Sequence, residues 1–404
     1  MSNLNVKTPS MIGGILLVTG NIIGTGILAL PIATSQLGLP YAIIMLFAFW
    51  LLMLLGAYYY LEANLALPPG KNLISMSRLA FGKPGVVIAW IANLLVMYSL
   101  ISAYLSGGGD LIKTNLNYLG ITLPSWIATV FFLFIFGFIV SRGINVVDYL
   151  NRPLMILKGI IFTLLISGLA MHADFSIIAI PQQNISVSLL IIIITSYGFA
   201  TLIPSLRTYY QSDVKKIKKI IFISTFISFI CYVLWITFVF SVLPYHGNNG
   251  LQEIANSTHP LSDLQLALNQ ALHVTWITQS MNLFSAICII TSFMANSISL
   301  TDFIADGCNL TKNHSKAWLI YLITYLPPIW AVLFYQKAFI YGLSIAGMIA
   351  IIQLLILPGL IVWRFRYSRN HFTSTYFVAG GKLLLILLLT ASCIPLFLSL
   401  AIKS

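Results

Sequence analysis

The groups in this sequence best suited to chemistry are peptide groups, because ionisable side chains are scarce. Charged residues make up 7% of the 404 residues, and hydrophobic residues make up 59%. Two long apolar stretches are interrupted, one by glycines between Gly13 and Gly26 and by Pro31, the other by Gly198 and Pro204. Relative to alanine, glycine costs about 1 kcal/mol in a helix interior and proline about 3 kcal/mol. We therefore predict that both helices break and leave N–H and C=O groups without helical partners.

Two broken helices that meet can hold a zwitterion. Free N–H groups at the start of a half-helix form a positive dipole end that suits a carboxylate, and the last C=O groups of the preceding half-helix can accept from an ammonium. Close packing of small residues, such as Gly20 against a neighbouring helix, is the alternative explanation of the first break. The substrate contacts predicted from the two breaks are Asn21, Ile22, Ile23, Gly24, Thr25, Gly26, Thr195, Ser196 and Tyr197.

Side chains elsewhere in the apolar stretches are expected to contact the substituent of such a ligand. Tyr98 and Ser102 share one helix face through their i, i+4 spacing, and Tyr104 follows in the same stretch. Phe199 follows the second break, where its ring could cover a ligand. Tyrosines also pack between helices and at membrane interfaces, so a structural role stays open for each of them. The remaining candidates for this pocket are Asn282 and Ser285.

Lys158 is the most informative ionisable residue, because a long apolar run follows it. Charged groups inside a membrane are costly and mark functional sites by default. Snorkelling to the membrane surface is the alternative, since Arg152 lies only six residues earlier, or about 9 Å along a helix.

Eleven apolar stretches must position these residues. A helix needs about 20 mostly apolar residues to cross a hydrocarbon core of roughly 30 Å. We therefore predict an all-α polytopic membrane protein with a single transmembrane domain over residues 1–404. The stretches cover approximately residues 10–36, 39–66, 85–109, 124–141, 153–172, 186–206, 218–243, 274–301, 316–334, 338–363 and 377–401.

The distribution of basic residues predicts how the chain is oriented. The net charge is +12, and with the N-terminus in the cytoplasm all 21 lysines and arginines except Lys113, Lys337 and Lys403 fall inside or at the inner edge. This is the positive-inside pattern of membrane proteins, and it explains the charge without nucleic-acid binding. Eleven spans then place the C-terminus in the periplasm.

The two interrupted stretches are five spans apart, so they cross the membrane in opposite directions. Interrupted helices at corresponding places in two halves indicate an inverted-repeat transporter with its binding site near the midplane. The predicted fold has a first repeat at about 10–172, a second at about 186–363 and an eleventh helix at about 377–401.

Several segments resemble the hydroxy/aromatic amino acid permeases, the bacterial tyrosine and tryptophan permeases of the amino acid–polyamine–organocation superfamily. In order along the chain they are MYSLISAYLSGGGDLI (97–112), DYLNRPLMILKGIIF (148–162), TSYGFATLIPS (195–205), LTDFIAD (300–306) and YLPPIWAVLFY (325–335). The resemblance implies a LeuT-like 5+5 inverted repeat with helices 1 and 6 broken. It also implies a proton symporter of the bacterial inner membrane that imports tyrosine, tryptophan or phenylalanine, with no cofactor and no metal.

The same resemblance assigns proton coupling to Lys158, which stands where sodium-coupled relatives hold sodium, and to Thr291 and Ser292, which resemble hydroxyl ligands of that sodium site. The Lys158 ammonium is then expected to bond the first-span backbone near Gly20 and these two hydroxyls. One departure concerns the substrate. Where the resemblance leads us to expect Gly-Phe-His-Gly, this sequence has Gly-Phe-Ala200-Thr201. The side-chain preference is therefore open, and a symporter of serine or threonine is the alternative.

Other function classes fit the sequence less well. The Gly-Gly-Gly-Asp segment ending at Asp110 matches a pattern of intramembrane aspartyl proteases, but the partner candidate Asp148 falls on the opposite side of the membrane. No selectivity-filter repeat or ring of like charges indicates a channel. A sensor that binds an amino acid without carrying it stays open, and the sequence does not indicate an oligomeric state.

Overall fold

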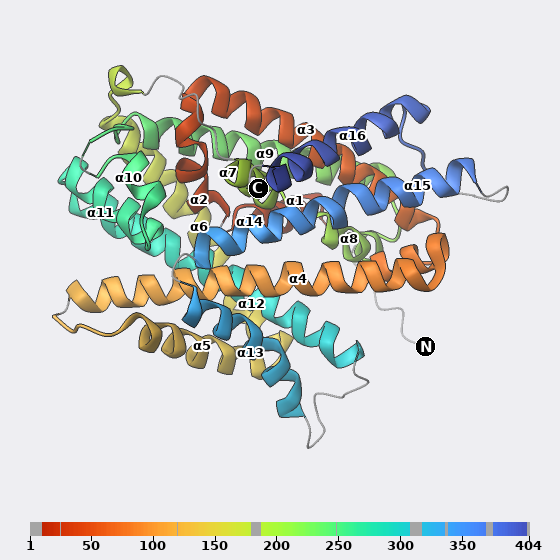
Figure 1. Ribbon diagram of the computed structural model, residues 1–404, viewed down its shortest axis with the longest axis horizontal. Helices are drawn as coiled ribbons and strands as arrows, with labels where there is room; N and C mark the ends of the chain where they lie inside the picture. Colours follow the sequence, from red (N-terminus) through yellow and green to blue (C-terminus); the bar gives the residue numbers. More distant parts are fainter. Residues whose placement is uncertain are drawn as a thin grey trace.

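The chain is folded almost entirely into helices. A computed structural model describes residues 10–24, 26–118, 120–178, 187–247, 249–307, 317–335, 338–368 and 375–401. Within these ranges the helices form one bundle, and no β-strand occurs (Figure 1). The predicted all-α class is therefore confirmed.

Most of these helices have the length and composition of membrane spans. Seven stretches among the described residues are long and apolar enough to cross a bilayer, and four shorter apolar helices of 10–17 residues accompany them. Large hydrophobic side chains stay exposed on the outside, such as Phe134 at 73% and Leu383 at 78%, as contact with lipid requires. The chain is thus a multi-pass membrane protein. Each predicted apolar stretch contains one of these helices, and crossing by the four shorter ones stays a prediction.

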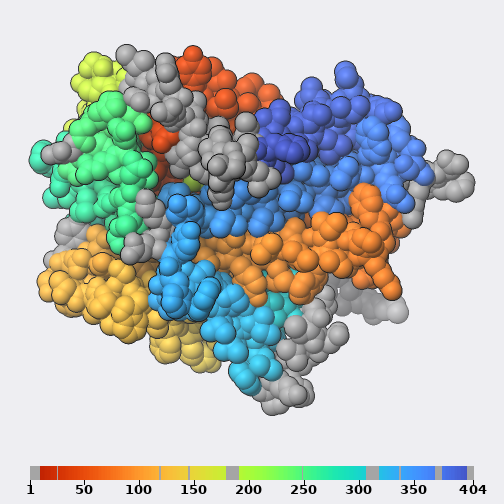
Figure 2. All heavy atoms as spheres, viewed as in Figure 1, coloured from red at the N-terminus to blue at the C-terminus, as the bar shows by residue number. Residues whose placement is uncertain are grey.

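The continuous helices form the body of the bundle. The helix α4 lies along α14, and Figure 2 shows the two surfaces closely packed. At 46 residues, with a kink at Gly82 where φ is 67°, α4 is longer than the predicted span at 85–109. These helices are α3 (Gly38–Leu65), α4 (Leu73–Tyr118), α5 (Ser125–Ser141), α6 (Ile144–Met171), α9 (Val214–Phe240), α12 (Thr275–Gly307), α13 (Ala317–Phe334), α14 (Ala338–Ile351), α15 (Leu357–Tyr367) and α16 (Gly381–Ala401). A π-helical turn at Ile352–Ile356 joins α14 to α15.

The first predicted break is present between α1 (Met11–Ile22) and α2 (Gly26–Thr34). Ile23 leaves the helical conformation with φ −74° and ψ 73°. Pro31 does not mark the break, because it lies inside α2. The interruption therefore follows the glycines and not the proline.

The second predicted break separates α7 (Val187–Ser196) from α8 (Ile203–Tyr209), with a short 3-10 turn at Ala200–Leu202 between them. Here the proline does contribute, because Pro204 lies in the first turn of α8, where its missing N–H leaves no hydrogen bond unmade. The second half of the first broken helix, α2, packs against the first half of the second, α7.

A pair of short helices covers one end of the bundle (Figure 1). These are α10 (Leu251–Asn256) and α11 (Pro260–Leu272), neither of which we predicted from the sequence. α11 packs against both α2 and α4. It therefore connects this end of the first broken helix to its neighbour.

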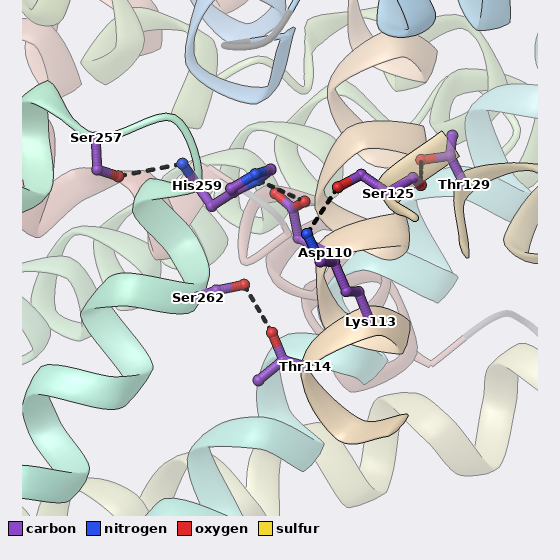
Figure 3. Close-up of polar contacts among 8 residues, drawn as sticks. All are labelled: Asp110, Lys113, Thr114, Ser125, Thr129, Ser257, His259 and Ser262. Carbon is purple, nitrogen blue, oxygen red and sulfur yellow. Dashed lines mark hydrogen bonds and ion pairs between the residues drawn. The ribbon is translucent and has the colours of Figure 1, made fainter. Parts of the chain in front are cut away.

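Polar contacts tie α11 to the end of α4 (Figure 3). His259 Nδ1 lies 2.8 Å from Asp110 Oδ1, and the side chain of Asp110 is only 8% exposed. The Thr114 hydroxyl donates to Ser262 Oγ at 3.1 Å, also between the two helices. Lys113 donates to Ser125 Oγ at 2.9 Å.

This tether is expected to weaken as the pH rises. The hydrogen bond to Asp110 raises the pKa of His259 above 6.5, helped by the charge of Asp263 and opposed by burial and by Lys113. A histidine whose pKa is raised by folding contributes stability that is complete below its ordinary pKa and is lost as the pH rises through the raised value. Hydrogen–deuterium exchange should therefore show the protection factors of α11 falling as the pH rises above about 6.5. In His259→Gln the protection factors of α11 should be low at every pH. Protection that does not change with pH in the unsubstituted protein would contradict the prediction.

Candidate functional site

A cavity of about 260 Å³ lies where the two broken helices face each other. From the first break it is lined by Gly20, Asn21, Ile22, Gly24 and Gly26, and from the second by Thr195, Ser196, Gly198, Thr201 and Leu202. Most substrate contacts that we predicted from the breaks, although far apart in sequence, thus share one wall. Of the others, Ile23 and Tyr197 do not line the cavity, and Thr25 lies outside the described residues.

Glycine is required where the two breaks cross. A Cβ atom at Gly26 would lie 2.8 Å from the Ser196 Cα and 2.6 Å from its Oγ, which is closer than real side chains come. At Gly24 a Cβ atom would lie 2.8 Å from Ser292 Oγ on α12. The glycines therefore let α2, α7 and α12 approach at the level of peptide groups.

Lys158 is directed at the first break and not at the membrane surface. Its side chain on α6 is 4% exposed, and the ammonium donates to the carbonyl of Ile23 at 2.8 Å and to that of Gly20 at 3.4 Å. No carboxylate forms an ion pair with it among the described residues. A buried ammonium thus holds the end of α1, which is the contact with the first-span backbone that we predicted from the sequence.

The predicted contact between Lys158 and the two hydroxyls of α12 is not formed. Thr291 donates instead to the carbonyl of Ile287 at 2.7 Å, one turn back in its own helix. Both Thr291 and Ser292 nevertheless line the cavity. Their part in coupling stays a prediction.

The wall opposite the breaks is formed by α4 and α12. Met97, Leu100 and Tyr104 line it from α4, at the spacing of one helix face. From α12, Asn296 donates to the Tyr104 hydroxyl at 3.3 Å and to the carbonyl of Ser292 at 3.0 Å. The α4 side of this wall is mainly apolar, whereas α12 contributes mainly polar side chains.

Two of the polar residues at the cavity were missed in the sequence. One is Asn296, which follows Ser292 by four positions and so lies on the same face of α12. The other is Gln353, a lone polar residue in an apolar run, where a π-helical turn carries it to the cavity while it donates to Asn93 at 2.9 Å. Helix periodicity measured from Ser292 could have indicated the first, and isolation in an apolar run the second.

Other predicted pocket residues lie away from the cavity. Tyr98 and Ser102 occupy the face of α4 that meets α13, where their hydroxyls lie 2.9 Å from the carbonyl of Ile323 and 3.4 Å from that of Pro328. Phe199 is fully buried and does not line the cavity. Asn282 and Ser285 lie at least seven residues before Ser292 on α12, or about 10 Å at the rise of a helix. A role for these residues in binding stays a prediction.

The cavity extends from the breaks toward the end of the bundle that carries Met11. Leu17 and Gly20 line it from α1, whereas α2 contributes Gly26 alone. All other residues of α2 are buried, so the half of the bundle beneath α11 is closed. The arrangement offers peptide groups for a charged head group, an apolar surface on α4 and polar side chains on α12, and it opens away from α11.

Comparison with known proteins shows the family to which the chain belongs. Residues 7–398 match the sequence model of the tryptophan/tyrosine permease family. The chain is 29% identical to the tyrosine-specific transport system 1 of Haemophilus influenzae, over 97% of both chains. It is 30% identical to the tryptophan-specific transport protein of Pseudomonas aeruginosa, over 93% of this chain and 90% of the relative. It is also 25% identical to the low affinity tryptophan permease of Escherichia coli, over 95% and 94%.

Proposed function

We propose that this chain, which belongs to the tryptophan/tyrosine permease family, imports an aromatic amino acid together with protons by alternating access. It is a permease and not an enzyme. The relatives reported above are named as transport proteins specific for tyrosine or tryptophan. The observation that carries the proposal is the cavity between two helix breaks, where peptide groups of Ile22, Gly24, Gly26 and Ser196 line one wall. Such groups suit the carboxylate and the ammonium of any amino acid.

The proposed architecture is a LeuT-like pair of inverted repeats. The contact of α2 with α7 and the two breaks five apolar stretches apart support it. With the N-terminus in the cytoplasm of a bacterial cell and the C-terminus in the periplasm, the open side of the cavity faces inward. The described conformation is then the one that releases substrate to the cytoplasm.

Proton coupling is assigned to Lys158. A buried ammonium that holds the carbonyl of Ile23 ties α1 to α6, and loss of its proton removes the charge that makes this hydrogen bond strong. The proton and the substrate would thus act on the same break. Release of the proton toward the cytoplasm would loosen α1 beside the cavity.

Uptake into proteoliposomes tests the proposed function. Radiolabelled tyrosine should accumulate when the outside is acidic, without sodium, and unlabelled tryptophan or phenylalanine should compete. Serine and threonine should not compete at the same concentrations. Uptake that depends on sodium would refute the proton as the coupling ion. Competition by serine or threonine alone would support the alternative substrate class.

Asn296 is expected to select aromatic substrates with a polar tip. Its two amide hydrogens are used within the protein, and no partner of its Oδ1 is found in the part of the chain that the structure describes. It lies one turn, about 6 Å, beyond Ser292, which touches Gly24, so a phenol or indole held at the break reaches it. Loss of one neutral hydrogen bond lowers the binding affinity roughly tenfold.

In Asn296→Leu, the affinity for tyrosine relative to phenylalanine should therefore fall about tenfold. Competition uptake measures this ratio. Asn115→Leu removes an amide from α4, at a position that does not line the cavity, and is the control. An unchanged ratio in Asn296→Leu would exclude the selective role.

A further inference from the structure

Tyr232 is a buried tyrosine whose hydroxyl oxygen lies within hydrogen-bond distance of both helix breaks. It belongs to α9, and its side chain has no exposed surface. Its hydroxyl lies 2.7 Å from the carbonyl oxygen of Ile22, the last residue of α1. The same hydroxyl lies 2.7 Å from the carbonyl oxygen of Ser196, the last residue of α7. The two carbonyl oxygens are therefore no further apart than twice this distance.

A tyrosine hydroxyl has one hydrogen, so it cannot donate fully to two carbonyls at once. Ile22 also accepts from the N–H of Gly24 at 2.8 Å. No other donor to the Ser196 carbonyl is found among the described residues. The pair of oxygens thus has room for another donor, although a buried carbonyl usually has its hydrogen bonds made.

Ile22 and Ser196 line the cavity, whereas Tyr232 does not. A ligand in the cavity would therefore meet the two residues of this carbonyl pair, while the hydroxyl reaches their oxygens from α9. The Tyr232 ring packs against Tyr197, with ring centroids 5.1 Å apart, which holds the hydroxyl in place.

We propose that Tyr232 is a positioning residue, which holds the carbonyls of Ile22 and Ser196 together as a paired acceptor for the ammonium of the substrate. An ammonium brings three hydrogens and a charge, and it supplies the hydrogen bonds that one phenol cannot. Because the hydroxyl bridges both breaks, it also makes the two broken helices respond to the ammonium as one unit. The inference rests on the proposed binding of an amino acid in the cavity.

Tyr232→Phe tests this role, because it removes the hydroxyl and keeps the ring. Binding of an aromatic amino acid is compared with binding of its des-amino acid, which has the same ring and carboxylate but no ammonium. The unsubstituted protein should prefer the amino acid by roughly tenfold to a hundredfold, the range for hydrogen bonds of a charged group. In Tyr232→Phe this preference should fall about tenfold, while affinity for the des-amino acid stays the same.

A matched control is Ser228→Ala, which removes another buried hydroxyl from α9, one that donates to Ser224 within its own helix. It should keep the full preference. A merely structural effect of Tyr232→Phe would weaken the binding of both ligands equally, and this result would overturn the proposal. An unchanged preference for the amino acid over the des-amino acid would overturn it as well. If the unsubstituted protein binds neither ligand, the proposed function fails and not the role of Tyr232 within it.

A second measurement uses the unsubstituted protein, in case Tyr232→Phe does not fold. Infrared difference spectra of protein labelled with ring-¹³C tyrosine should show a shifted phenol C–O band when the amino acid binds. The des-amino acid should cause no such shift. The same spectrum with both ligands would overturn the proposal.

Discussion

Lys158→Ala is expected to abolish accumulation of substrate against its gradient. The ammonium is the one charged group that holds the carbonyl of Ile23 at the first break, at 2.8 Å, among the residues that the structure describes. For each proton coupled, a gradient of one pH unit drives about tenfold accumulation, because one unit corresponds to about 1.4 kcal/mol. Without the lysine, the proton gradient is no longer coupled to substrate transport. The substrate concentration inside should therefore not exceed the concentration outside.

Exchange across the membrane should survive better than accumulation in Lys158→Ala. The cavity wall itself keeps its peptide groups, so counterflow in proteoliposomes without a pH gradient should persist. Arg152→Gln is the matched control on the same helix, because its side chain is 77% exposed and pairs only with Asp148 at 2.6 Å. It should accumulate substrate normally. Undiminished uphill uptake by Lys158→Ala would refute the coupling role.

Gly26→Ala is expected to reduce transport at least about fivefold through packing alone. The added methyl would lie 2.8 Å from the Cα of Ser196, and a backbone atom cannot move aside as a flexible side chain can. Extra methylene groups in a tightly packed core typically cost about 1–3 kcal/mol, or roughly fivefold to more than a hundredfold in the population of the packed state. The contact of α2 with α7 should therefore open, and the wall of the cavity with it.

The control for this prediction is Gly159→Ala on α6. A Cβ atom there would meet nothing within 4 Å, and alanine favours a helix interior over glycine by up to about 1 kcal/mol. Gly159→Ala should therefore transport normally with equal or higher thermal stability. Initial rates of tyrosine uptake at matched protein amounts measure both variants. Wild-type rates in Gly26→Ala would show that the crossing tolerates a side chain.

The location of the two breaks could be predicted because it depends on local backbone chemistry. Gly24 and Gly26 favour an interruption wherever the helix lies, and this interruption ends α1 at Ile22, as the one around Gly198 ends α7 at Ser196. The all-helical class follows equally directly from the apolar stretches. Lys158 stood out because a charge in such a stretch needs a partner.

The identity of the side chains at the cavity depended on which face of each helix is turned inward. Tyr98 and Tyr104 are both aromatic residues of α4, yet the first meets α13 and the second lines the cavity. The register of α12 likewise brings Asn296 to the cavity in place of Ser285, and a π-helical turn rotates Gln353 toward it. Composition does not encode such rotations, since they are set by helices distant in the sequence.

The sequence alone therefore specified a helical membrane protein with two breaks and one unusual lysine, because each depends on the cost of placing a residue type in lipid or in a helix. Packing in three dimensions brought Tyr232 from α9 to both breaks and Lys158 to the end of α1. Those partners lie more than 30 residues away from the groups they hold, so only the assembled bundle could bring them together.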